Sequence, residues 1–282
     1  MPESPEVHEL ASFLTAHTTG REVRAVDVLL PKALKTQHPM PADLVGRRIT
    51  GVSRLGKMID IATTAASGDT LHVIVHFGHD GWVLWHDVAP EGLMRAGEAT
   101  LMARIRLSDG SGFDLTDAGQ WKALSIHLVA SPADVPAVAK LGLDPLGDEF
   151  DTAAFAGILA NRKKQIKALL QDQTSFAGIG NAYSDEILHA AKISPVTHAA
   201  SLSPDAVDRL ADATRDVLAE ATSARRGVPP SELRATKHAA LRVHRKTGAA
   251  CPVCGDEIRE YTFSGAAAQY CPTCQTGGAL LA

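Results

Sequence analysis

The distribution of cysteine is the strongest constraint on how this chain folds. All four cysteines lie in the last 32 residues and form two Cys-x2-Cys pairs separated by sixteen residues: Cys251, Cys254, Cys271 and Cys274. This spacing is typical of a zinc ribbon or zinc finger. Two disulfides or a redox pair are the alternatives, but the N-terminus lacks the basic-then-apolar order of a signal peptide. We therefore expect one structural Zn²⁺, which contributes folding free energy to a hairpin too small to fold alone.

Length and composition set further limits. The chain has 282 residues, of which 45% are hydrophobic, so we expect two domains or one domain with an appendage. No apolar run approaches the roughly 18–20 residues that a membrane-spanning helix needs. We expect a soluble, cytoplasmic protein. The net charge of −4 argues weakly against a nucleic-acid partner, although the distribution of charge matters more than its total.

The first six residues, Met1 to Glu6, allow an unusual kind of catalysis. Removal of Met1 would leave Pro2 as an N-terminal secondary amine. An α-amino group has a pKa of about 8, so part of it is neutral at physiological pH and can attack a sugar carbon or an aldehyde. Glu3 would then be placed to move protons. The alternative is that Pro2 is a common second residue and Glu3 is solvated.

Hydrophobic periodicity changes along the chain. Residues 5–19 have helical spacing, and short alternating segments between 22 and 128 predict the strands of a β-sandwich or barrel. Prolines and glycines cluster between 131 and 150, which we interpret as an interdomain connection. From 151 to about 226 the spacing is helical again.

Two features of the helical part suggest a polyanion partner. Residues 161–167 carry four Lys or Arg and no acid, and residues 225–248 carry seven against one Glu. The second feature is a glycine-rich turn, Gly178-Ile179-Gly180, after which a new helix begins at Asn181. A helix N-terminus can bind a phosphate, and Asn181 could cap the helix or bind the same phosphate. Solvated helix faces and a tight helix–helix turn are the alternatives.

Four motifs in order carry a resemblance to a known family. They are Pro2-Glu3 with Glu6, Arg54-Leu55-Gly56-Lys57, the Asp172–Leu188 segment, and Tyr270-Cys271-Pro272-Thr273-Cys274-Gln275. Over nearly its whole length the chain resembles the formamidopyrimidine-DNA glycosylase and endonuclease VIII family.

The resemblance implies an α+β fold in three parts. A β-sandwich with an N-terminal helix would span 1–130, and a linker would span 131–150. A helix–two-turns–helix domain would follow at 151–240, with a zinc-finger β-hairpin at 241–282.

The resemblance also implies an activity. The family consists of base-excision-repair DNA glycosylases that also act as abasic-site lyases, and they evert the damaged base before removing it. Pro2 would attack C1′, expel the base and form a Schiff base, which β-elimination and often δ-elimination would follow. Glu3 matches the family's proton shuttle, and Glu6 matches an acidic position that supports it. Lys57 matches a hairpin lysine that contacts phosphate and assists proton transfer.

The implied partner is double-stranded DNA containing a damaged base or an abasic site, bound by a monomer. Asn181 matches the turn residue that contacts the phosphates flanking the lesion. Lys163 and Lys167 match basic positions along the DNA backbone.

The sequence departs from the family pattern at three places. Ala266 stands where a phosphate-binding arginine of the finger hairpin is expected, and alanine cannot replace its charge-assisted bonds. His79 replaces a methionine that fills the space left by the everted base. Gly119 and Gln120 replace paired arginines that face the opposite base, although the following Trp121 could still insert between bases. We therefore expect weak discrimination of the opposite base.

Two other classes of function compete with the enzyme. A protein that binds lesions or abasic sites but cuts poorly would explain Ala266 and the altered inserting side chains, but it would not need Pro2, Glu3 and Lys57. A zinc-ribbon transcription factor would explain the cysteines and nothing at the N-terminus. The enzyme also requires that Met1 be removed, since Pro2 is otherwise an amide. The preferred base is open: oxidised or ring-opened purines, oxidised pyrimidines and bulky or crosslinked adducts all fit.

Overall fold

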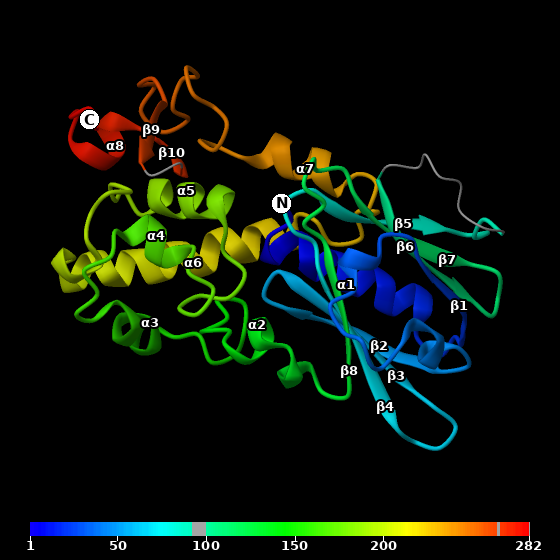
Figure 1. Ribbon diagram of the computed structural model, residues 1–282. Coiled ribbons are helices and arrows are strands. Elements are labelled where there is room, and N and C mark those ends of the chain that lie inside the picture. The colour runs from blue at the N-terminus through cyan, green and yellow to red at the C-terminus, as the bar shows by residue number, and fades with distance from the viewer. Residues whose placement is uncertain (92–99, 264–265, 282) are drawn as a thin grey trace. The chain divides into compact units, whose positions relative to one another are not determined.

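The structure, a computed structural model, describes residues 1–91, 100–263 and 266–281 (Figure 1). The chain forms two compact units. Unit 1 consists of Met1–Lys140 and Arg225–Arg234, and unit 2 consists of Leu141–Ala224 and Ala235–Ala282. Residues 225–234, which the sequence analysis assigned to the helix–two-turns–helix domain, thus group by their contacts with unit 1.

Unit 1 is built around two four-stranded antiparallel sheets, as expected for a β-sandwich (Figure 1). One sheet has the order β1-β6-β7-β5, with strands Val23–Val28, Leu101–Leu107, Gly112–Asp117 and Gly81–His86. The other has the order β2-β3-β4-β8, with strands Arg48–Leu55, Met58–Thr64, Thr70–His76 and Ser125–Val129. Both sheets contribute to one hydrophobic core, because alternate residues of each strand point inward.

Helix α1 (Ser4–Thr18) packs beside β2, and it begins and ends one residue earlier than the predicted span of 5–19. Val7, Leu10 and Leu14, at helical spacing, are fully buried in the core of unit 1. The face of α1 that carries these side chains therefore fixes the helix, and with it the N-terminal residues, on the sandwich.

Unit 2 is mainly helical, with α3 (Thr152–Leu159), α4 (Ile166–Leu170), α5 (Asn181–Ala190) and α6 (Pro204–Ser223). Its core is separate from that of unit 1 and includes Phe155, Phe176 and Leu210. Helix α6 begins where Ser203 Oγ accepts from the Ala206 N–H at 3.3 Å, with proline at the first helical position.

The C-terminal part of unit 2 is a β-hairpin, β9 (Arg259–Phe263) and β10 (Ala266–Tyr270), followed by the short helix α8 (Pro272–Thr276). The two strands are antiparallel, and Ala266 pairs with Phe263 beside the hairpin tip. The remaining elements are short: η1 (Pro31–Ala33), η2 (Pro41–Leu44), η3 (Pro132–Asp134), α2 (Pro136–Ala139), η4 (Ala199–Ser201) and α7 (Leu233–Ala240). Within the described ranges, no helix is both long and apolar enough to span a bilayer.

Candidate active site and metal centre

The N-terminal residues are held in place by the first turn of α1. Pro2 and Glu3 are both buried, and Glu3 is the N-cap residue in an extended conformation. The backbone N–H of Glu3 donates to Oε2 of Glu6 at 3.0 Å. A carboxylate in the first turn is also favoured by the helix dipole. Glu6 therefore fixes the backbone directly after Pro2.

A second contact of Glu6 is an ion pair with Arg225. The Arg225 Nε lies 3.0 Å from Oε1 of Glu6, and both side chains are 1% exposed. One turn further along α1, Oε1 of Glu9 accepts from the Gly227 N–H at 2.8 Å. The sequence analysis placed Arg225 in a basic run and did not find this role, since nothing local signals a partner on α1.

Lys57 lies in the two-residue turn between β2 and β3. Leu55 and Met58 pair across the turn, and Gly56 has a φ of +58° that glycine adopts without strain. The Lys57 side chain is largely buried. Arg54, just before the turn, donates from Nη1 to Ser4 Oγ at 3.3 Å. The contact between Arg54 and Ser4 thus brings this end of β2 to the start of α1.

Two loops of unit 1 carry His79 and Trp121, which are predicted to contact DNA beside the everted base. His79 lies in the turn between β4 and β5, and Trp121 lies between β7 and β8 with 83% of its surface exposed. The turn that holds His79 is stabilised by His76, whose Nδ1 accepts from the Gly78 N–H at 3.1 Å. Burial lowers the pKa of His76, with further lowering by the positive charges of Lys57, His79 and His127. His76 is therefore suited to remain a neutral acceptor.

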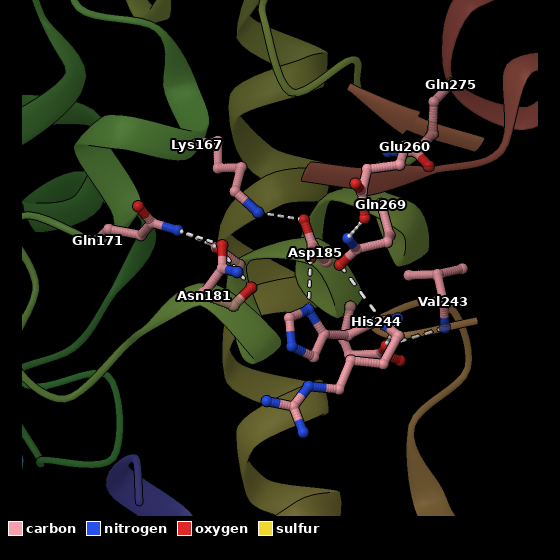
Figure 2. Close-up of polar contacts among 12 residues, drawn as sticks. Lys167, Gln171, Asn181, Asp185, Val243, His244, Glu260, Gln269 and Gln275 are labelled. Carbon is pink, nitrogen blue, oxygen red and sulfur yellow. Dashed lines mark hydrogen bonds and ion pairs between the residues drawn. The ribbon is translucent and has the colours of Figure 1, made fainter. Parts of the chain in front are cut away.

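In unit 2, Asn181 is the first residue of α5, as the sequence predicts (Figure 2). Gln171 donates from Nε2 to Asn181 Oδ1 at 3.0 Å and to Ser184 Oγ at 3.1 Å. Gln173 supports the preceding turn, since its Nε2 donates to Ile179 O at 2.8 Å and its Oε1 accepts from the Gly178 N–H at 2.9 Å. Gln171 was not singled out from sequence, and Gln173 belongs to the Asp172–Leu188 motif without an assigned role.

The two lysines predicted to lie along DNA have different surroundings. Lys163 is exposed, next to Arg162 and Lys164, in a basic surface segment. Lys167 is instead buried and bonds to Oδ1 of Asp185 (Figure 2). The bond to Asp185 lies within unit 2. A contact between Lys167 and DNA remains a prediction.

Three polar residues of α5 face the segment that leads into the metal site. Asp185 accepts from His244 Nδ1 at 2.7 Å, in addition to its bond with Lys167 (Figure 2). Glu186 accepts the backbone N–H groups of residues 242, 243 and 244, each at 2.9 Å. Burial raises the pKa of Glu186, and these three N–H groups act in the opposite direction. His189 is buried, with its Nε2 3.2 Å from Cys251 Sγ.

The four cysteines form the metal site that the sequence predicts. Their sulfur atoms all lie within 4.8 Å of one another. The Cys251–Cys274 and Cys254–Cys271 sulfur distances are 3.9 Å and 3.3 Å. Tetrahedral Zn²⁺ with Zn–S bonds of about 2.3 Å requires sulfur atoms about 3.8 Å apart. The donor set and its size therefore fit one structural Zn²⁺.

Family models match three successive parts of the chain. Residues 1–122 match the formamidopyrimidine-DNA glycosylase N-terminal domain, residues 141–229 match the formamidopyrimidine-DNA glycosylase H2TH domain, and residues 248–277 match a zinc finger found in FPG and IleRS. The domains occur in the order that the fold shows.

Relatives and solved structures agree with these matches. The formamidopyrimidine-DNA glycosylase of Mycolicibacterium gilvum is 34% identical over 98% of both chains. An uncharacterized formamidopyrimidine-DNA glycosylase-like protein of Mycobacterium tuberculosis is 47% identical over 53% of this chain and 94% of its own. A structure of MutM in complex with DNA containing carbocyclic 8-oxo-G has a TM-score of 0.85 at 27% identity, covering 98% of this chain and 100% of that one.

These features define a DNA-repair glycosylase with a structural zinc finger. The chain belongs to the formamidopyrimidine-DNA glycosylase family.

Proposed function

We propose that this protein is a bifunctional DNA glycosylase and abasic-site lyase that uses Pro2 as its nucleophile. The observation that carries the proposal is the pair of buried carboxylates, Glu3 and Glu6, at the start of α1. The Glu3 N–H donates to Oε2 of Glu6 at 3.0 Å, which holds the backbone directly after Pro2. A surface-exposed N-terminus would have no need of two buried carboxylates and a buried arginine. Family membership supports the same chemistry.

The reaction needs the amine that removal of Met1 produces. The Pro2 nitrogen attacks C1′ of the damaged nucleotide, and the glycosidic bond breaks with its electron pair leaving on the base. Loss of the amine proton and opening of the sugar at C1′–O4′ give an iminium ion, with Glu3 delivering the proton to O4′. Removal of a C2′ proton then breaks the C3′–O bond, and the DNA strand on the 3′ side of the lesion leaves with a 5′ phosphate. Lys57, in its turn beside α1, neutralises phosphate charge in these steps.

The proposed partner is double-stranded DNA with a damaged base or an abasic site, bound by a monomer. Similar structures are described as complexes of MutM with DNA containing carbocyclic 8-oxo-G and of Lactococcus lactis Fpg with DNA containing an abasic site. Asn181 at the start of α5 and the exposed Lys163 would contact phosphates. His79 and Trp121 would fill the space left by the everted nucleotide.

Weak opposite-base discrimination belongs to the same proposal. Gly119 and Gln120 offer no guanidinium for a bidentate contact with an orphaned base, and Ala266 offers none for a phosphate. We expect similar excision rates with each of the four opposite bases. A strong preference for cytosine in steady-state kinetics would contradict this part of the proposal.

Borohydride trapping of untagged protein tests the central step. Protein incubated with abasic-site DNA and borohydride should give a covalent complex, and Pro2→Gly and Glu3→Gln should weaken it. The intact mass of the protein shows beforehand whether Met1 has been removed.

The second candidate function is a lesion-binding protein with little catalysis. Ala266 and the altered inserting residues favour it, because they remove groups that would support cleavage. No trapped complex, with tight binding to the same DNA retained, would decide for this candidate.

A further inference from the structure

Residues 225–234 form a strap that runs along unit 1. At one end, Arg225 pairs with buried Glu6 and the Gly227 N–H donates to Glu9. In the middle, the carbonyl oxygen of Pro230 accepts from Trp82 Nε1 at 2.8 Å. Near the other end, the side chain of Leu233 is fully buried in the core of the sandwich. The strap therefore joins the start of α1 to strand β5.

The last residue of the strap, Arg234, contacts the turn that holds His79. Its Nη2 donates to the carbonyl oxygen of Asp80 at 2.9 Å and lies 3.3 Å from that of Gly81. Its guanidinium also lies over the ring of Trp82, 4.5 Å from the ring centroid. Such a cation–π contact orients the planar guanidinium toward the two carbonyl groups.

The second loop reaches the same carbonyl oxygen. The Ala118 N–H donates to Asp80 O at 3.3 Å, so Arg234 and the loop that holds Trp121 share one acceptor. The loops are also in close contact, because a Cβ on Gly119 would lie only 2.9 Å from Asp80 Oδ2.

Hydrogen bonds within the Trp121 loop also stabilise its conformation. Oδ1 and Oδ2 of buried Asp117 accept the N–H groups of Gly119 and Leu124, each at 2.8 Å. Lys122 Nζ donates to the Asp117 carbonyl at 2.8 Å. A large aromatic side chain held 83% exposed on such a loop is prepared for a contact outside the molecule.

We propose that Arg234 is a positioning residue for base eversion: it fixes the His79 turn against the Trp121 loop so that both side chains enter DNA together. The inference rests on the proposed function, because it assumes that these two side chains insert. Arg234 acts on the step before bond cleavage and does not touch the reacting atoms.

The test uses a duplex that contains a tetrahydrofuran abasic analogue with 2-aminopurine opposite it. Insertion of side chains unstacks the 2-aminopurine and raises its fluorescence, and no bond is cleaved. We compare the full-length wild-type protein with Arg234→Met, which keeps the length of the side chain but removes its donors. Arg234→Lys keeps the charge but not the planar group. Arg24→Met is the matched control, since Arg24 is an exposed arginine of β1 paired with Glu91.

At saturating protein, Arg234→Met should reduce the fluorescence gain at least fivefold. Its Kd for the duplex should change less than threefold, and Arg24→Met should match wild type. Arg234→Lys should recover only part of the signal, because an ammonium group cannot stack on Trp82 and hold the same geometry. Borohydride trapping on true abasic DNA, where no base remains to be everted, should change less than twofold in Arg234→Met.

Three outcomes would overturn the inference. One is an unchanged fluorescence gain in Arg234→Met. Another is full recovery by Arg234→Lys, which would mean that charge alone suffices. The third is a loss of the fluorescence gain that weaker binding explains. In that case the Kd for the duplex rises, and its dependence on salt concentration falls by the equivalent of about one phosphate contact. Failure of wild type to be trapped would contradict the proposed lyase chemistry, whereas the fluorescence result would still decide the role of Arg234.

Discussion

The β-sandwich of unit 1 and the cysteine hairpin of unit 2 are stabilised in different ways. The sandwich has a large core to which both sheets and α1 contribute. The core of the hairpin consists of Val243, Cys251, Ile258 and Cys271, with Cys274 packed against them. So small a core cannot outweigh the conformational entropy of the segment, and the metal must supply the difference.

This contrast shows how each unit positions its own proposed functional residues. In unit 1, packing and the buried Glu6–Arg225 pair position the N-terminus. In unit 2, the segment before the metal site is connected to α5, the helix that begins with Asn181, through Asp185, Glu186 and His189. The metal should therefore influence DNA binding through α5, while the nucleophile should be independent of it.

The largest expected effect is that of zinc removal. All three tryptophans, Trp82, Trp85 and Trp121, lie in unit 1, and all three tyrosines lie in unit 2. Chelation should change the tyrosine signal and weaken binding to abasic-site DNA at least 100-fold, while tryptophan emission and α1 remain unchanged. Fluorescence with selective excitation and a binding titration check this. Loss of the tryptophan signal at the same chelator concentration would show that the two regions do not differ as described.

Removing Arg225 should have the next largest effect. Arg225→Met removes one member of the buried Glu6–Arg225 pair, and breaking such a pair costs about 3–5 kcal/mol. Urea unfolding followed by tryptophan fluorescence should show a loss of this size. The double variant Glu6→Gln with Arg225→Met should regain part of the stability, because the side chain at position 6 is then neutral. Equal stability of Arg225→Met and wild type would mean that packing alone fixes the N-terminus.

A smaller effect is expected at His189. Its Nε2 lies 3.2 Å from Cys251 Sγ, where an N–H donor stabilises a metal-bound thiolate. His189→Ala should release zinc to a chelator about 10–100 times faster. His189→Gln, which can still donate, should remain close to wild type. Equal release rates for Ala and Gln would assign the effect to packing.

The smallest effect concerns pH and unit 1 only. Burial lowers the pKa of His76, and the positive charges of Lys57, His79 and His127 lower it further. The unfolded chain therefore binds this proton more tightly than the folded chain does. Stability should therefore be full above the unfolded pKa of about 6.5 and should fall as pH drops below it. Melting temperatures between pH 7.5 and 5.5 measure the slope, which His76→Gln should flatten. A slope of the opposite sign in wild type would contradict this assignment.

Sequence predicted the local features of this molecule well. The helical spacing of Val7, Leu10 and Leu14 gave α1, alternation gave the strands, and the spacing of the cysteines gave the metal site. Each of these signals depends on a few neighbouring residues, or on a donor set with fixed geometry.

Contacts between distant residues could not be predicted in the same way. The partner of Arg225 lies on α1, and Gly227 is 218 residues from its acceptor Glu9. Lys167 has the sequence context of a surface lysine, but its partner Asp185 follows 18 residues later and is fully buried. These partners are brought together by tertiary packing, so no pattern among neighbouring residues predicts them.

Peptide mapping of the borohydride-trapped complex tests the central claim most directly. Untagged protein is trapped on abasic-site DNA, digested with nuclease and protease, and analysed by mass spectrometry. The account predicts that the deoxyribose remnant is attached to the N-terminal peptide that begins with Pro2, with fragment ions placing it on the proline nitrogen. Attachment to Lys57 or to another lysine, with the Pro2 peptide unmodified, would contradict it.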